Sequence, residues 1–100
     1  MNIIIESLHI EASQVPETLI RRKFNHLERF YDRIESCKVV LHKEKNDVQN
    51  SYIIEAVIKV PDNLLFSSDA SGAYEIALDK VIHNLEKQLH RYKEKLYEKR

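Results

Sequence analysis

Basic side chains recur at the spacing of helix turns in two stretches of this sequence. Near the end of the chain they follow at intervals of seven, four and four: Lys80, Lys87, Arg91 and Lys95. A second set follows at intervals of four, three and four: Arg22, His26, Arg29 and Arg33. On a helix of about 3.6 residues per turn, each set shares one flank beside an apolar stripe. Such rows of cations can neutralise successive phosphates of a polyanion, with strongly salt-dependent binding.

The net charge hides this sorting, because the chain has 16 basic and 16 acidic side chains. Residues 16–34 and 72–100 each carry a net charge of +2, whereas residues 1–15 and 35–71 each carry −2. Acids gather on the opposite flank of each stripe: Glu17, Glu28 and Asp32, then Glu75, Asp79, Glu86 and Glu94. Solvated helix surfaces more often mix the two signs as i,i+4 pairs, so the sorting favours an anion-binding surface. Periodicity does not show whether the two basic flanks point the same way; side by side, they would form a groove or ridge of seven fixed cations with His26.

Other residues offer weaker chemistry. Four possible ligands of a divalent metal follow one helical flank at spacings of four, three and four: Asp79, His83, Glu86 and His90. A solvated acidic flank that contains two histidines would show the same pattern. Cys37 has no nucleophile motif around it, and a chain with one Gly lacks the loops that cradle phosphates. We therefore expect no enzyme, no metal, no cofactor and no small-molecule substrate.

Apolar periodicity predicts the elements that position these residues. Residues 2–10, 37–45, 52–60 and 64–70 are expected to form strands, with turns at 46–51 and 61–63. A helix is expected from an N-cap at Ser13, through Pro16 in its first turn, to about Ile34. Its stripe is Ile20, Phe24, Leu27, Tyr31 and Ile34. A last helix opens at Ser71 and Gly72, with the stripe Tyr74, Leu78, Val81, Leu85, Leu89, Tyr92 and Leu96.

This order, β-α-β-β-β-α, predicts an α+β fold in which two helices pack on one face of a four-stranded sheet. One hundred residues suit one domain, residues 1–100. A single cysteine and the lack of a signal or membrane-spanning run indicate a cytoplasmic protein. We expect it to be a monomer when free. Because Phe24, Tyr31, Tyr74 and Tyr92 fall on the apolar stripes, we expect recognition of the backbone and shape of a folded RNA rather than of its bases.

Two segments resemble a known family. "KFNHLERFYDRIESCKVVLHKEK" resembles the first helix and second strand of the ribosome hibernation-promoting factors, also called ribosome-associated translation inhibitors. "ALDKVIHNLEKQLHRYKEKL" resembles their last helix, with its A-x-D start and its Q-L-x-K/R-x-K-x-K end. The likeness covers nearly the whole chain, and the order and spacing of the motifs are more specific than either motif alone. The fold it implies is similar in shape to double-stranded RNA-binding domains.

The resemblance also implies a function. Members of this family bind the small ribosomal subunit where messenger RNA and the A- and P-site tRNAs would lie, and they inhibit translation in stationary or stressed cells. They contact ribosomal RNA with basic residues of both helices, a role that would fall here on Arg22, Lys23, Arg29, Lys87, Arg91, Lys93 and Lys95. Lys23 and Lys93 come from the resemblance alone, because both lie across the stripe from the basic flank.

Three points qualify this expectation. The chain resembles a short form without the second domain that pairs two ribosomes, so it would inhibit alone or act with another factor. Its neutral charge departs from the more basic domain that the resemblance implies. An alternative function is a protein-interaction module that uses the charged helix flanks to dock a partner or a second copy.

Overall fold

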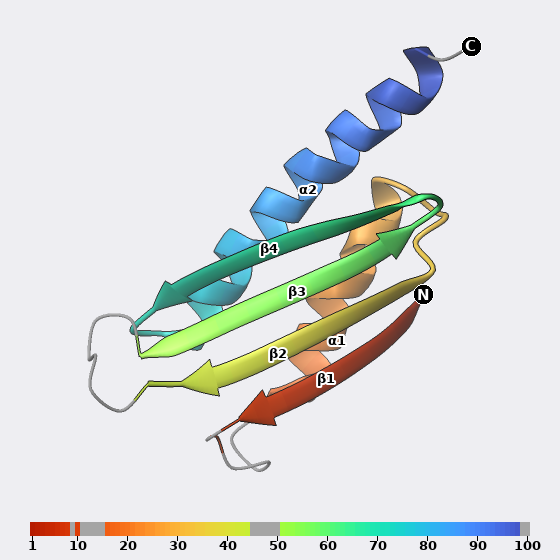
Figure 1. Ribbon diagram of the computed structural model, residues 1–100. Helices are drawn as coiled ribbons and strands as arrows, with labels where there is room; N and C mark the ends of the chain where they lie inside the picture. The colour runs from red at the N-terminus through yellow and green to blue at the C-terminus, as the bar shows by residue number, and fades with distance from the viewer. Residues whose placement is uncertain (9, 11–15, 45–50, 99–100) are drawn as a thin grey trace.

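The computed structural model describes residues 1–8, 10, 16–44 and 51–98, and the Ser13 cap and the turn at 46–50 lie outside them. The elements follow the predicted β-α-β-β-β-α order, which confirms the α+β fold (Figure 1). They are β1 (Asn2–Leu8), α1 (Glu17–Asn25), a short 3-10 helix η2 (His26–Arg29), β2 (Ser36–Lys43), β3 (Tyr52–Val60), β4 (Asn63–Ser71) and α2 (Tyr74–Glu98).

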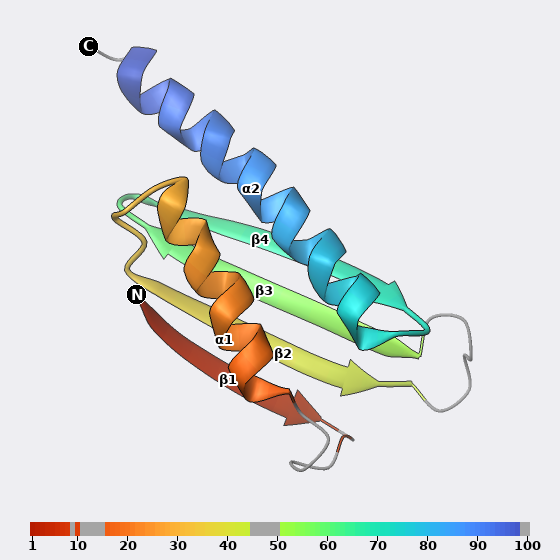
Figure 2. The same ribbon diagram turned by 180° about the vertical axis from the view of Figure 1, so that it is seen from behind.

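The four strands form one mixed sheet in the order β1-β2-β3-β4. β1 and β2 are parallel, and such a pair needs a crossover connection, which α1 and η2 supply. The remaining neighbours are antiparallel hairpin partners. Figure 2 shows both helices on one face of this sheet, with α2 running diagonally until its last turns project beyond β4. No helix in the described part of the chain is long and apolar enough to span a membrane.

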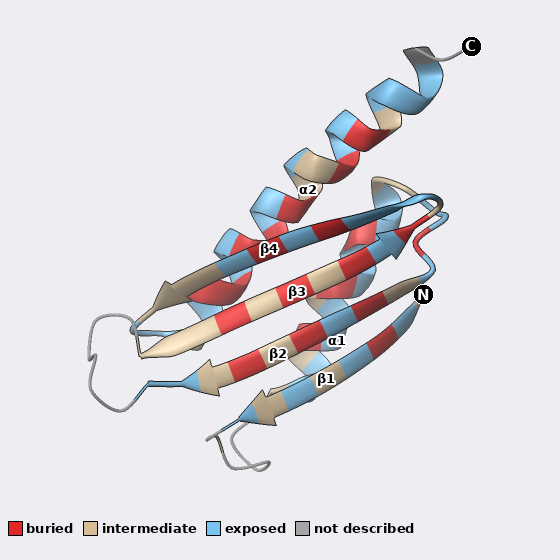
Figure 3. Ribbon diagram, viewed as in Figure 1, coloured by how far each residue is buried: buried red, intermediate tan, exposed pale blue. Residues whose placement is uncertain are grey.

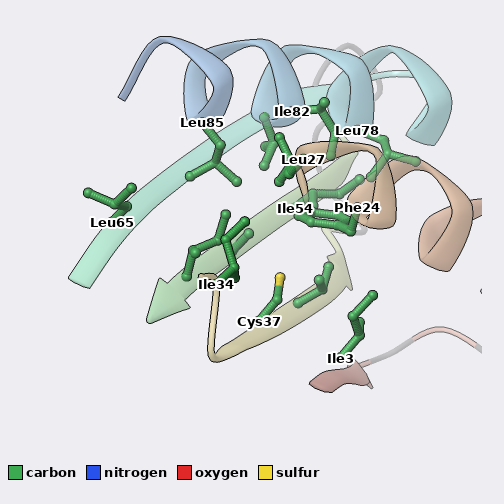
Figure 4. Packing of buried hydrophobic residues seen from close by; sticks show 14 of the residues in the cluster. Ile3, Phe24, Leu27, Ile34, Cys37, Ile54, Leu65, Leu78, Ile82 and Leu85 are labelled. Carbon is green, nitrogen blue, oxygen red and sulfur yellow. The ribbon is translucent and has the colours of Figure 1, made fainter. Parts of the chain in front are cut away.

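The core lies between the sheet and the two helices (Figure 4). Strand residues alternate between this face and the open face, as Figure 3 shows along β2 and β3. The predicted inward set of β3 is confirmed, since Ile54, Ala56, Ile58 and Val60 are at most 1% exposed. Most of the predicted helix stripes are also buried: Ile20, Phe24, Leu27, Ile34, Leu78, Val81, Leu85, Leu89 and Tyr92. Tyr31 and Tyr74 lie at the margin of the core and are only half-buried.

The first helix is shorter than its periodicity predicts. α1 ends at Asn25, η2 continues for one tight turn, and Ile34 lies beyond both. Ile34 is nevertheless buried, because the turn that follows η2 carries it back over the start of β2. The change to 3-10 geometry alters the direction of the side chains near Arg29, which matters for the site.

Side chains of the helices cover both outer edges of the sheet. Arg21 Nη1 donates to the Ile3 carbonyl of β1 at 3.1 Å, and Gln88 Nε2 donates to the Phe66 carbonyl of β4 at 2.6 Å. Exposed strand edges are templates for pairing with another chain. Arg21 and Gln88 therefore occupy positions where a foreign strand would otherwise bond.

Candidate nucleic-acid interface

The two helices meet along a line where opposite charges face each other. Lys23 of α1 forms an ion pair with Asp79 of α2, and a hollow beside this pair is lined by Arg22, His26 and Ile82. Asp79 belongs to the flank on which the sequence gathers acids. The acidic flank of α2, and not its basic flank, is thus turned toward α1. Along this line the two basic flanks therefore do not face each other.

The opposite flank of α2 lies over β4. Gln88 bonds there to the Phe66 carbonyl, and Lys80 Nζ lies 3.9 Å from an Asp69 carboxylate oxygen. Lys80 is therefore partly neutralised beside the sheet. Lys87, Arg91 and Lys95 are exposed on the rest of this basic flank. The basic flank of α2 therefore borders β4 at Lys80 and is exposed to solvent at Lys87, Arg91 and Lys95.

The cations of the first helical segment also face outward. Arg22, His26 and Arg29 are exposed, and Arg29 Nη1 lies 3.4 Å from His26 Nε2. Arg33, in the turn after η2, is exposed as well. These cations and those of α2 are carried by the helical layer that covers one face of the sheet (Figure 2). We call them, with the half-buried Lys93, the outer helical surface: Arg22, His26, Arg29, Arg33, Lys87, Arg91, Lys93 and Lys95. Eight of the ten candidate residues belong to this set; Lys23 is paired with Asp79, and Lys80 lies near Asp69.

The two helical segments come together again at a cleft near the end of α2. Arg29 and Arg33 line one side of it and Lys93 lines the other, and its volume is about 640 Å³. Lys93 lies across the stripe from the basic flank, yet the packing of α2 against η2 sets it beside the arginines. A second, smaller hollow of about 310 Å³ holds Lys87 and Arg91 next to Phe30. Cations of both helices therefore converge at this end of the molecule.

Aromatic residues at this cleft are the functional candidates that the sequence reasoning missed. Phe30, Tyr31 and Tyr97 line it together with the cations. The stripe placed Tyr31 in the core. Phe30 lies in the first segment that resembles the family but was given no binding role, and Tyr97 lies just beyond the second segment. Their only signal in the sequence is the alternation of aromatic and basic residues in "ERFYDR" and "RYKEKLY".

The other chemistry considered for this chain finds little support in the geometry. Cys37 is 1% exposed, and burial raises the pKa of its thiol to about 12, so the reactive thiolate is disfavoured. In the described residues, no three His, Cys, Asp or Glu side chains are grouped closely enough to hold a metal ion. His83 and His90 instead lie near Glu86 and Glu94, at 3.8 and 2.8 Å, and Asp79 pairs with Lys23.

Comparison with known proteins identifies the family. Residues 3–97 match the model of the family described as Sigma 54 modulation protein / S30EA ribosomal protein. The chain belongs to this family. Relatives named ribosome hibernation promoting factor include one from Salmonella typhimurium, 29% identical over 96 residues that cover 96% of this chain and 97% of that protein. Another, from Escherichia coli K12, is 28% identical with the same coverage. The resemblance seen in the sequence is thereby confirmed.

Solved structures agree on the fold. A ribosomal subunit interface protein from Coxiella burnetii superposes with a TM-score of 0.81 at 24% identity, covering 93% of this chain and 98% of that one. The N-terminal domain of Protein Y from Thermus thermophilus gives 0.80 at 22% identity, covering 92% and 99%. The family description names a ribosomal protein and no enzyme class, so ribosome binding and translation regulation are the functions on which these comparisons converge.

Proposed function

We propose that this protein is a ribosome hibernation factor that binds ribosomal RNA of the small subunit in the region of messenger RNA and the A- and P-site tRNAs, and so inhibits translation under stress or in stationary phase. The observation that carries the proposal is the outer helical surface: in a member of this family, two separate helical segments that cover one face of the sheet both carry exposed cations. Cations spaced along helices neutralise RNA phosphates, and the body of the domain fills space that tRNA and messenger RNA need. The protein acts in the cytoplasm as one domain and needs no catalysis.

Charge placement also explains how a neutral chain can bind a polyanion. On the open face of the sheet, Lys38 lies 3.5 Å from Glu6 and Lys59 lies 3.8 Å from Glu35, so cations there are accompanied by carboxylates. The helical side keeps Arg22, Lys87 and Arg91 exposed. RNA would therefore approach the helices, because the sheet side has a balanced field.

The alternative, a module that docks a protein partner through its acidic helix flanks, has less support. Asp79, in the second turn of α2, forms an ion pair with Lys23 within the molecule. Glu86 lines the hollow beside Phe30 together with two cations, Lys87 and Arg91. Asp79 is thus engaged between the two helical segments, and Glu86 and Glu94 lie near histidines of α2 itself, His83 and His90.

The test is co-sedimentation of the protein with purified bacterial small subunits across a range of salt concentrations. A variant with Arg22→Ala, Lys87→Ala and Arg91→Ala removes three outward cations from the helices. The matched control, Lys38→Ala, Lys43→Ala and Lys59→Ala, removes three exposed cations from the strands and changes the net charge equally.

We expect the wild-type protein to pellet at low salt and to be displaced by tRNA. Each phosphate contact contributes roughly 0.7–0.9 to the slope of log affinity against log salt. The helix variant should therefore bind at least about tenfold more weakly, with a slope shallower by roughly two. The strand variant should bind as the wild type does. Equal losses in both variants, or no pelleting of the wild type at low salt, would reject the proposal.

A further inference from the structure

We propose that the cleft between the η2 turn and the end of α2 binds a single unpaired nucleotide, with its base against the aromatic residues and its phosphate against the cations. The inference rests on the proposed function where the nucleotide is part of ribosomal RNA. The cleft is lined by residues 28–33 on one side and by Lys93, Leu96 and Tyr97 on the other. Its volume of about 640 Å³ falls within the roughly 300–1,000 Å³ of small-molecule sites.

The charges of the cleft match a nucleotide better than a bare anion. Arg29, Arg33 and Lys93 supply donors for a phosphate, and arginine also stacks on planar bases. Two carboxylates lie among them. Glu28 is 3.1 Å from the amino group of Met1, and Asp32 is exposed. Carboxylates repel phosphate but accept hydrogen bonds from the amino groups of bases and from the ribose 2′-hydroxyl, so the mixture suits a ligand that presents both kinds of group.

The aromatic side of the cleft is held in a set orientation. The Tyr31 ring packs edge-on against Tyr92, with ring centroids 5.3 Å apart and planes at 82°. Tyr92 is fixed in turn, because its hydroxyl donates to the Pro61 carbonyl at 2.7 Å in the turn between β3 and β4. Tyr31 is half-buried and is one of the residues that line the cleft. A ring positioned in this way loses little conformational entropy when a base stacks on it.

This site changes the expected manner of recognition. The basic flanks bind backbone, and backbone is available in paired and unpaired RNA alike. An aromatic cleft requires a base that has left its helix, because the base faces of a duplex are covered by stacking. The cleft would therefore favour a looped or bulged segment over a duplex without specifying which base it holds.

Two RNA probes test this, a stem–loop with an unpaired loop and a duplex of equal length, each labelled for fluorescence anisotropy with the intact protein. Tyr31→Leu removes the stacking ring. Tyr52→Leu is the matched control, since Tyr52 makes a similar edge-on pair with Tyr74, at 6.1 Å and 72°. These are the first residues of β3 and α2, and both elements begin at the end of the molecule opposite the last turns of α2 (Figure 1). Tyr97→Leu provides a second cleft variant on the exposed last turns of α2, should loss of Tyr31 impair folding.

Stacking on one aromatic side chain corresponds to about a 5- to 150-fold change in affinity. We expect Tyr31→Leu or Tyr97→Leu to weaken stem–loop binding within this range and to leave duplex binding within about twofold. Tyr52→Leu should change neither. Equal losses for the two RNAs, or no loss for the stem–loop in a folded cleft variant, would overturn the proposal.

A second arm separates RNA from free nucleotides as the source. Adenosine monophosphate is titrated into ¹⁵N-labelled protein, and the amide signals of residues 30–33 and 93–97 are followed. Shifts confined to these residues support the cleft even if ribosome co-sedimentation fails, so the two proposals can fail separately. No shifts, together with the stem–loop effect, assign the site to RNA. Absence of both effects rejects the cleft as a nucleotide site.

Discussion

Tyr92 contacts the turn between β3 and β4 through its hydroxyl and the cleft residue Tyr31 through its ring. Tyr92→Phe removes the hydroxyl oxygen alone and so tests the first contact. The residue is 9% exposed, and its hydroxyl donates to the Pro61 carbonyl at 2.7 Å. A buried hydrogen bond contributes roughly 0.5–1.5 kcal/mol, and the half-buried Pro61 allows water to reach the carbonyl in the variant. We expect a loss of about 1 kcal/mol at pH 7. In a domain of this size that lowers Tm by roughly 4–8 °C.

The pH dependence of this loss gives a sharper result. Burial raises the pKa of Tyr92 to about 12 from its ordinary value of 10, with smaller contributions from the neighbouring Tyr31. Between pH 10 and 12 the unfolded chain releases a proton that the folded chain retains. The free energy of unfolding of the wild type therefore falls by up to about 1.4 kcal/mol per pH unit in this window, and this contribution is absent from the variant.

The stability curves of the two proteins should consequently cross near pH 11, where the alkaline loss of the wild type equals the hydrogen bond that the variant lacks. Cys37 adds the same pH dependence to both proteins and cancels in the difference. Urea unfolding followed by circular dichroism at pH 7, 9, 10 and 11 measures the difference in the free energy of unfolding between the two proteins. A difference that stays constant over this range would refute the assignment of a buried, proton-retaining hydroxyl.

Three further predictions concern other contacts. Asp79→Asn releases Lys23 from its ion pair and should strengthen ribosome binding a few-fold at low salt, measured by co-sedimentation; unchanged or weaker binding would contradict this. Removing both edge covers, with Arg21→Ala and Gln88→Ala, should promote self-association seen by light scattering, and a persistently monomeric variant would count against the role of these bonds. Native Cys37 should resist iodoacetamide at pH 8 until urea unfolds the chain, as mass spectrometry can show; equal labelling of native and unfolded protein would disprove its burial.

Most of the fold follows from the sequence because burial imposes a period on each element. Alternation in residues 52–60 and the helical stripe from Leu78 to Tyr92 place their apolar residues on the core side, as found. The end of α1 does not follow, because the 3-10 turn keeps Leu27 on the buried side as a continuous helix would. Because the spacing of buried residues is the same in both cases, the apolar stripe does not show where the α-helix changes to a 3-10 helix.

The sequence predicts only those features of the site that lie on one helix, namely the basic flank of each helical segment. Each basic flank is visible on its own wheel, and the outward exposure of Arg22, Lys87 and Arg91 agrees with it. Which flank faces the neighbouring helix depends on how both helices are set on the sheet. That arrangement pairs Lys23 with Asp79, information that no local pattern contains. Tertiary packing, and not helical periodicity, decides which cations remain free for a ligand.

The same packing explains why the cleft forms at the end of α2 and not at its middle. Up to about Gln88, α2 lies against the sheet, and its flanks are engaged by Lys23 near the start of the helix and by β4 further along. Its last turns project beyond the sheet (Figure 2), and there Leu96 and Tyr97 are 37% and 59% exposed. Aromatic and cationic side chains that would otherwise be covered by strands are thus left beside the η2 turn. An RNA loop reaching this end would meet side chains from both helical segments at once, whereas a duplex lying across the middle would meet only the outer rows of cations.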